Sequence, residues 1–153
     1  MRYHPASIIS GQLLINNIYM KRFVFICLGF MMISDISFSQ FKLNIEIAEI
    51  RNNSGNIMLQ LFDENEKVIR EEKNNITDNK CFFTIKNLKP GRYAVRYYHD
   101  ENMNGKMETN LVGKPTEGYG FSNNVIGKFG PPPFVKWLFE INSDKKIILK
   151  PTY

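Results

Sequence analysis

The chain has 153 residues, of which 20 are Lys or Arg and 15 are Asp or Glu, so its formal net charge at pH 7 is +5. Hydrophobic residues make up 43% of it, which excludes an intrinsically disordered protein and leaves room for one domain. Beyond the N-terminal region no apolar run reaches roughly 18 residues, which excludes a polytopic membrane protein. Collagen, coiled-coil and repeat patterns are also absent from the sequence.

The N-terminal part has the order of a secretory signal peptide, predicted over residues 20–39. Two basic residues at 21–22 precede an apolar run at 23–33, and a small-residue cleavage site follows. This order predicts export and cleavage, over the alternatives of a membrane anchor or a buried helix. Residues 1–19 add nothing that a signal peptide needs. We interpret them as an upstream extension or a mis-set start, with Met20 as the true one.

The predicted mature domain spans residues 40–153. Cleavage removes Cys27 and leaves Cys81 as the single thiol, so no intramolecular disulfide is expected. It also leaves 17 basic and 14 acidic residues, a net charge of +3. The remaining Lys and Arg are scattered, whereas nucleic-acid binders cluster them on a stripe or a helix face. We therefore expect a periplasmic or secreted domain with no nucleic-acid partner and no integral membrane segment.

Alternation of apolar and polar residues predicts a first strand over residues 41–50. Its inward face is expected to consist of Phe41, Leu43, Ile45 and Ile47. A turn cluster at 51–55 joins it to a second strand at 56–62, as a hairpin. Within the polar segment 63–79, residues 64–73 fit either a short helix or an exposed strand pair around Val68 and Ile69, and the pattern does not decide between them.

A third strand is predicted at 81–85 and a fourth at 92–99, with a Pro-Gly turn between them. Residues 100–133 form a long irregular stretch rich in Gly, Asn and Pro, and such stretches are usually functional or disordered. Two further strands, at 135–141 and 145–150, close the chain. The pattern predicts an all-β fold, an antiparallel β-sandwich of about seven strands with one long loop region.

The sharpest local motif is D-x-N-x-N-G at residues 100–105, which matches the first half of a calcium loop. Oxygen atoms at alternate positions converge there on a hard cation, and the glycine makes a sharp bend. Position twelve is Leu111, where a helical calcium loop has its bidentate carboxylate. An Asx turn without metal is therefore the alternative. The candidate metal ligands are the side chains of Asp100, Asn102, Asn104 and Glu108 and the carbonyl of Lys106.

Catalytic motifs are weak in this sequence. The mature chain has one histidine, His99, and one cysteine, which are too few for a usual zinc site. Cys81 begins an apolar strand and fits a small buried residue better than a nucleophile. A hydrolase that uses loop carboxylates is the rival hypothesis. The carboxylates that fall near the same loops are Asp100, Glu101, Glu108 and Glu117.

Segments 115–124 and 128–134 place aromatic residues between glycines. Such loops present rings to a sugar or a peptide. Alternatively, the rings cap the open end of the sandwich and anchor the long loop. The candidate ligand-loop residues are His99, Glu117, Tyr119, Phe121, Asn123 and Phe129.

Four motifs in this order resemble the bacterial domain-of-unknown-function family 2141, and the resemblance covers nearly the whole mature chain. They are L-K-P-G-R-Y-A at 88–94, H-D-E-N-M-N-G-K at 99–106, G-K-P-T-E-G-Y-G-F-S-N at 113–123 and F-G-P-P at 129–132. The resemblance implies a small exported protein with an immunoglobulin-like or transthyretin-like sandwich. Glu108 stands where family members often carry Asp, which keeps an oxygen ligand. The family has no assigned activity, so the resemblance implies no catalytic residue.

The sequence thus favours an exported, non-enzymatic β-sandwich module that binds a protein or a glycan through its long loop region. It is either free of cofactors or stabilised by calcium. A sandwich without any ligand is a third alternative.

Overall fold

The computed structural model describes residues 39–128 and 130–153, which belong to one compact unit. The predicted upstream extension, the signal peptide up to residue 38 and Cys27 lie outside the described residues, as does Phe129. In the described part of the chain, no helix is long and apolar enough to cross a membrane.

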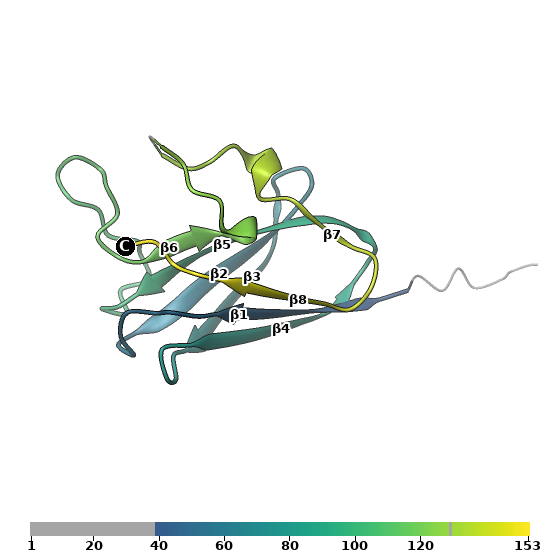
Figure 1. Cartoon of the computed structure of the whole chain (residues 1–153), viewed down its shortest axis with the longest axis horizontal. Coiled ribbons are helices and arrows are strands. Elements are labelled where there is room, and N and C mark those ends of the chain that lie inside the picture. Colours follow the sequence, from purple (N-terminus) through teal and green to yellow (C-terminus); the bar gives the residue numbers. More distant parts are fainter. Residues whose placement is uncertain (1–38, 129) are drawn as a thin grey trace, which may run out of the picture. The chain divides into compact units, whose positions relative to one another are not determined.

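Within the described residues, eight strands form two sheets of a β-sandwich (Figure 1), so the predicted all-β class is confirmed. The first sheet has three strands in the order β4-β1-β8, and they are β4 (Cys81–Leu88), β1 (Phe41–Ile47) and β8 (Lys145–Leu149). The second sheet has the order β3-β2-β5-β6, with β7 also paired to β5. Because β1 and β2 lie in different sheets, the hairpin predicted between the first two strands is wrong. Its strands are β2 (Asn56–Asp63), β3 (Val68–Asn75), β5 (Gly91–Asp100), β6 (Tyr119–Phe121) and β7 (Phe139–Ile141).

The hydrophobic core lies between the two sheets and follows the period-2 alternation of the strands. In β1, Leu43, Ile45 and Ile47 are buried as predicted, while Phe41 is half-buried at the start of the strand. Strand β2 contributes every second side chain from the facing sheet, beginning with Ile57. Burial of side chains of this size stabilises the fold by about 1.5–3 kcal/mol each. The core holds the strands, and the strand ends fix where the loops begin.

The undecided polar segment is a strand. β3 pairs with β2 along its whole length, at the edge of the second sheet, and its side chains are almost all exposed. Charged residues such as Arg70, Glu71 and Lys73 suit this position, because charges on an exposed edge strand discourage pairing with other chains.

The strand predicted over 135–141 is only partly correct. Phe134–Lys136 forms a short 3₁₀ turn, and β7 begins at Phe139. Alternation alone did not reveal that Trp137 is anchored: its indole N–H donates to the Pro132 carbonyl at 2.9 Å. The side-chain amide of Asn123 donates to the carbonyls of Lys136 and Leu138, which takes these groups away from a sheet partner.

The sandwich is also not purely antiparallel, because β8 pairs with β1 in parallel. The chain passes from β7 in one sheet to β8 in the other through residues 142–144. There the Asp144 carboxylate accepts a hydrogen bond from the Lys42 backbone N–H at 2.8 Å. This contact joins the start of β8 to the start of β1, at the end where their parallel register begins.

Candidate functional site

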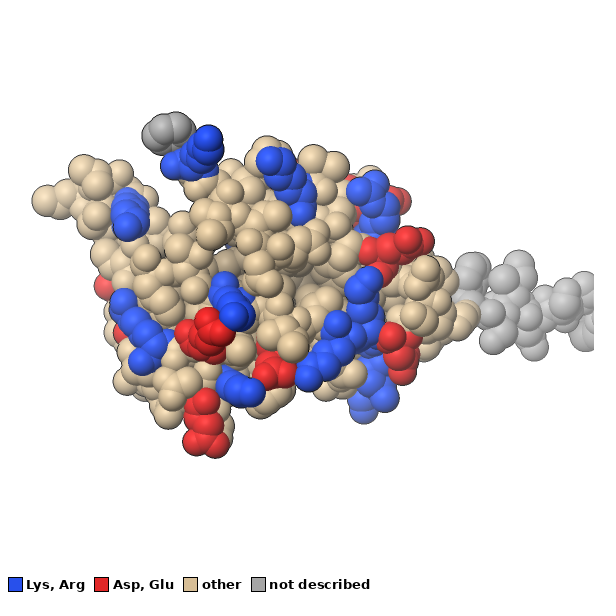
Figure 2. All heavy atoms as spheres, in the orientation of Figure 1, with Lys and Arg blue, Asp and Glu red and all other residues tan. Residues whose placement is uncertain are grey.

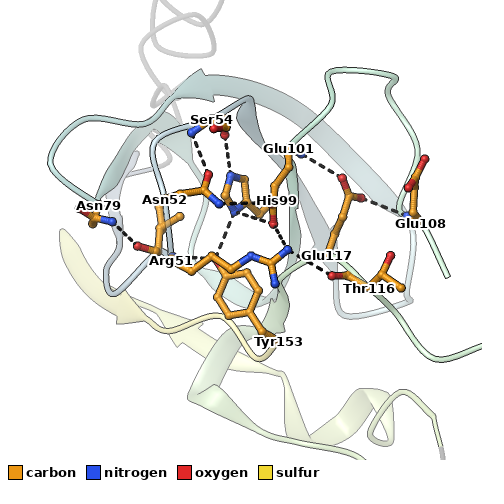
Figure 3. Close-up of polar contacts among 11 residues, drawn as sticks. Arg51, Asn52, Ser54, Asn79, His99, Glu101, Glu108, Thr116, Glu117 and Tyr153 are labelled. Carbon is orange, nitrogen blue, oxygen red and sulfur yellow. Dashed lines mark hydrogen bonds and ion pairs between the residues drawn. The ribbon is translucent and has the colours of Figure 1, made fainter. Parts of the chain in front are cut away.

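The base of the 101–117 loop is held by a buried carboxylate, Glu117 (Figure 3). Its two oxygens accept hydrogen bonds from the backbone N–H of Glu101 at 2.9 Å and of Glu108 at 3.1 Å. A bridge between Thr109 and Pro115 closes the loop above these contacts. Glu117 is therefore a structural brace that joins the two arms of the loop.

Asp100, which begins the predicted calcium motif, is buried and has the same kind of role. Its two oxygens accept from the backbone N–H of Asn104 at 3.0 Å and of Gly105 at 2.9 Å. Gly105 has a φ of +75°, a left-handed conformation that glycine adopts without strain. The sharp bend expected at this glycine is present.

The other predicted metal ligands lie in the same turn. The side-chain oxygen of Asn102 accepts from the Asn104 N–H at 3.1 Å, and that of Asn104 accepts from the Lys106 N–H at 2.8 Å. Both side-chain amides donate to one Glu108 oxygen, at 2.9 and 3.0 Å. Four of the five predicted ligand groups thus converge as a network of Asx turns, the arrangement named as the alternative to a bound metal.

A cation in this turn would depend mainly on neutral oxygens. Among the described residues, no three His, Cys, Asp or Glu side chains gather closely enough to hold a metal ion. The motif supplies two carboxylates, on Asp100 and Glu108, and the remaining donors are amide and carbonyl oxygens. Oxygen donors of both kinds suit calcium, and the small number of charged ligands implies low affinity.

His99 is fully buried beneath the loop base, with both ring nitrogens engaged. Nε2 lies 2.7 Å from the Ser54 carbonyl, which only accepts, so Nε2 carries the proton. In the neutral ring, Nδ1 then accepts from the Tyr153 hydroxyl at 3.1 Å. That hydroxyl accepts in turn from the Arg51 N–H at 3.1 Å. These contacts make His99 part of the fold and leave it no free nitrogen for a ligand.

Arg51 and Glu101 form an ion pair beside His99 (Figure 3), with 2.5 Å between nitrogen and oxygen. The guanidinium also lies over the Tyr153 ring, 4.5 Å from its centroid. Burial raises the pKa of Glu101, but hydrogen bonds from Asn52 and Arg51 and the Arg51 charge outweigh it. The net result is a Glu101 pKa below its ordinary value, so this carboxylate is ionised at neutral pH.

The S-N-N triplet at 122–124 fastens the second loop, residues 122–138 between β6 and β7, to the strands. The Ser122 hydroxyl donates to the Trp137 carbonyl at 2.6 Å and accepts from the Val95 N–H at 2.9 Å. Asn124 bonds the edge of β8, donating to the Ile148 carbonyl and accepting from the Lys150 N–H. Asn123, a candidate ligand residue, donates its amide to the carbonyls of Lys136 and Leu138 just before β7.

The aromatic residues between the glycines pack against the outer face of the second sheet. Phe121 and Trp137 are buried with Phe62 and Ala94 in a second cluster, separate from the core. The Phe121 and Trp137 ring centroids are 4.3 Å apart, and Phe134 lies edge-on to Trp137 at 5.3 Å. Tyr119 packs against the rim of this cluster. The rings anchor the long loop, although they cover a sheet face rather than an open end.

The described residues give the hydrolase hypothesis little chemical support. Cys81 is buried, and desolvation raises the pKa of its thiol to about 11, so it is not a thiolate at neutral pH. Asp100 and Glu117 use both of their oxygens on backbone N–H groups. A hollow of about 310 Å³ on the second sheet is lined by residues of β2, β3 and β5 and by Gly105, but by neither of these carboxylates.

Part of this network lies outside the motifs in the sequence. Arg51 and Asn52 belong to the predicted turn cluster at 51–55, and no motif includes Tyr153. The close fit of Gly118 against Tyr153 explains one of the glycines, because a Cβ at Gly118 would lie 2.4 Å from the tyrosine ring. A terminal aromatic residue has no periodicity, so no sequence signal pointed to its partners.

A protein-family model matches the chain, whereas comparisons with curated proteins and with solved structures give no match. The match covers residues 45–148 and is to a family described as an uncharacterised protein conserved in bacteria. It spans the strands from β1 to β8 and both loops, and it confirms the resemblance inferred from the four motifs. The chain therefore belongs to the bacterial family of uncharacterised proteins called DUF2141.

Proposed function

We propose that this protein is an exported, non-enzymatic β-sandwich module that binds another molecule through the loops between Asp100 and Phe134. We further propose that calcium stabilises the first of these loops. The observation that carries the binding proposal is the position of the exposed hydrophobic side chains. The four most exposed large ones in the described chain all lie on these loops, and they are Leu111, Val112, Met103 and Ile126.

The bases of the loops support the same proposal. Their polar and aromatic side chains are engaged with the backbone or with one another, so the loops are held in place before any partner arrives. Preorganisation of this kind lowers the entropic cost of binding. Exposed apolar side chains on such a scaffold are typical of interaction sites.

Two features support calcium in the first loop. Asp100 and Glu117 are buried carboxylates that form no ion pair with a described Lys, Arg or His. Asn56 lies opposite Asp100 in the β2–β5 register, and its buried side-chain oxygen has no donor among the described residues. A nearby cation would offset the cost of burying these oxygens.

The binding proposal is tested by labelling lysines with an amine-reactive reagent. Lys106, Lys114 and Lys128 on the loops are all exposed, as are the control residues Lys67 and Lys86 away from them. In the native envelope or extracellular fraction, the loop lysines should label more slowly than in the purified protein, and the controls should not. Equal labelling of both groups in both samples contradicts binding through the loops.

The calcium proposal is tested by thermal unfolding during a calcium titration. A ligand of the folded state raises stability by about 2.7 kcal/mol at a hundredfold excess over its dissociation constant. Asp100→Asn should abolish the response. The control is Asp63→Asn, because Asp63 also accepts two backbone N–H groups in a turn but lies outside the motif. No shift at millimolar calcium overturns this part of the proposal.

A further inference from the structure

The tip of the 101–117 loop presents two apolar side chains to solvent in a fixed conformation. Leu111 and Val112 are 106% and 86% exposed. The Asn110 side-chain oxygen accepts from the Val112 N–H at 3.1 Å and from the Lys114 N–H at 3.0 Å, and the Asn110 N–H donates to the Lys114 carbonyl. The Gly113 N–H also donates to the Asn110 carbonyl at 2.9 Å, so four hydrogen bonds within five residues define the tip. The hydrogen bonds of the tip therefore hold these two apolar side chains in an exposed position.

The charged residues around the exposed apolar side chains are nearly all positive. From residue 102 to residue 136 the exposed charges are Lys106, Lys114, Lys128, Lys136 and Glu108. The Glu108 carboxylate already accepts hydrogen bonds from two asparagine amides. The other acidic residue in this range, Glu117, is buried. The loops therefore present four exposed lysines beside apolar side chains, against one exposed carboxylate, Glu108.

Both loops project from the same side of the sandwich in Figure 1, above β5 and β6. Figure 2 shows basic side chains on both projections, whereas basic and acidic side chains alternate over the rest of the visible face. The second loop adds the exposed pair Ile126 and Lys128 to the first. We call the exposed groups of these two projections, Met103, Lys106, Leu111, Val112, Lys114, Ile126 and Lys128, the loop-tip surface.

We propose that the loop-tip surface docks on an anionic lipid membrane, with Leu111 and Val112 inserted at the level of the headgroups. This inference rests on the proposed function and names its partner. A convex apolar tip flanked by lysines matches a lipid interface, because apolar groups enter the acyl boundary while cations meet the negative headgroups. Each lysine near such a surface contributes about 1 kcal/mol, and the contribution falls as salt rises.

Co-sedimentation with vesicles tests the proposal. The full chain should bind vesicles made of equal parts of phosphatidylglycerol and phosphatidylcholine, and should bind pure phosphatidylcholine vesicles more weakly. The double variant Leu111→Asp/Val112→Asp should weaken binding about tenfold or more. Lys114→Ala should weaken it about fivefold at low salt, with a smaller effect at high salt.

The matched control is Phe82→Asp/Ile148→Asp on the outer face of the first sheet. Phe82 and Ile148 are 57% and 51% exposed and also have lysine neighbours, but they lie on a sheet rather than on a projecting tip. This control should bind the anionic vesicles as the unaltered protein does. All variants share the same N-terminal residues, so a difference between them arises from the substituted surface.

The outcomes separate the two proposals. Vesicle binding that is unchanged in the loop-tip variant, or equally weakened in the control, overturns the lipid inference. Protection of the loop lysines in the envelope fraction without binding to anionic vesicles also overturns it, and points to a protein or a glycan while leaving the proposed function in place. Absence of both protection and vesicle binding overturns both proposals.

Discussion

The base and the tip of the 101–117 loop differ in where their side chains are directed. At the base, Asp100 and Glu117 are buried and each accepts two backbone N–H groups. At the tip, Leu111 and Val112 have no described core contact and are fully or almost fully exposed. The polar residues that the sequence indicates as candidate ligands hold the loop, and two apolar residues that were not candidate ligands form its exposed tip.

The second loop shows the same division. Trp137, Phe121 and Asn123 fasten its base to the second sheet, while Ile126 and Lys128 are exposed farther out. Folding and binding are therefore expected to depend on different residues within one loop region. Substitutions at the bases should lower stability, and substitutions at the tips should not.

The largest loss of stability is expected at the base of the second loop. Trp137→Ala removes a buried ring from a cluster of aromatic neighbours, together with the hydrogen bond to Pro132. Chemical denaturation should show a loss of about 3–5 kcal/mol. Phe82→Ala, at an exposed ring, is the control and should change the free energy of unfolding by about 0.5 kcal/mol at most. Similar losses in both variants would contradict the anchoring role of Trp137.

The second-largest loss of stability is expected at Glu117, which joins the two arms of the 101–117 loop. In Glu117→Gln, the amide nitrogen cannot accept, so one of the two backbone N–H groups loses its partner. We expect a loss of about 2–3 kcal/mol in denaturant unfolding. The exposed Glu64 provides the control, and Glu64→Gln should have almost no effect. A neutral result for Glu117→Gln would show that the carboxylate is not a brace.

A smaller effect is expected at the bend of the calcium motif. Gly105 has a positive φ and open space around its Cα, so Gly105→Ala strains only the backbone. The expected loss is about 1 kcal/mol. At Gly91, which does not have a positive φ, the same substitution is the control. If calcium binds here, Gly105→Ala should also weaken the calcium response, and an unaltered response would contradict the proposed ligand loop.

The smallest effect should be the pH dependence of the Arg51–Glu101 pair. The folded-state pKa of Glu101 is lowered, so its contribution to stability is present above the unfolded value of about 4.3. It is lost as the pH falls through the lower folded-state value. Unfolding free energies of the unaltered protein and of Glu101→Gln should thus differ at neutral pH and converge in acid. Parallel curves across that range would argue against the pair.

The sequence predicted what depends on local periodicity and missed what depends on distant partners. Alternation located β1, β2, β5 and β8, because a half-buried strand imposes its period on the side chains. Alternation over 135–141 was misleading, since Trp137 is held by Pro132 and by the Ser122 hydroxyl. The carbonyls on either side of it, of Lys136 and Leu138, accept from the amide of Asn123. The parallel pairing of β8 was also missed, because the chain crosses from one sheet to the other after β7, and alternation does not show which strand becomes the neighbour.

In the candidate site too, the sequence indicated contacts between neighbouring residues but not contacts between distant ones. The D-x-N-x-N-G motif correctly located a tight turn of converging oxygens, because Asx turns depend on neighbouring residues. The role of Glu117 depends on two N–H groups in other parts of the loop, and that of His99 depends on Ser54 and Tyr153. Such partners are brought together only by the fold. The motif alone therefore could not distinguish a ligand from a brace.

The most direct test of the account combines two measurements on the Leu111→Asp/Val112→Asp variant. We predict that its free energy of unfolding equals that of the unaltered protein, within about 0.5 kcal/mol per substitution. We also predict that the loop lysines lose their protection from labelling in the native envelope or extracellular fraction. A large loss of stability, or protection that persists in the variant, would contradict the claim that the loop tips bind a partner while the loop bases stabilise the fold.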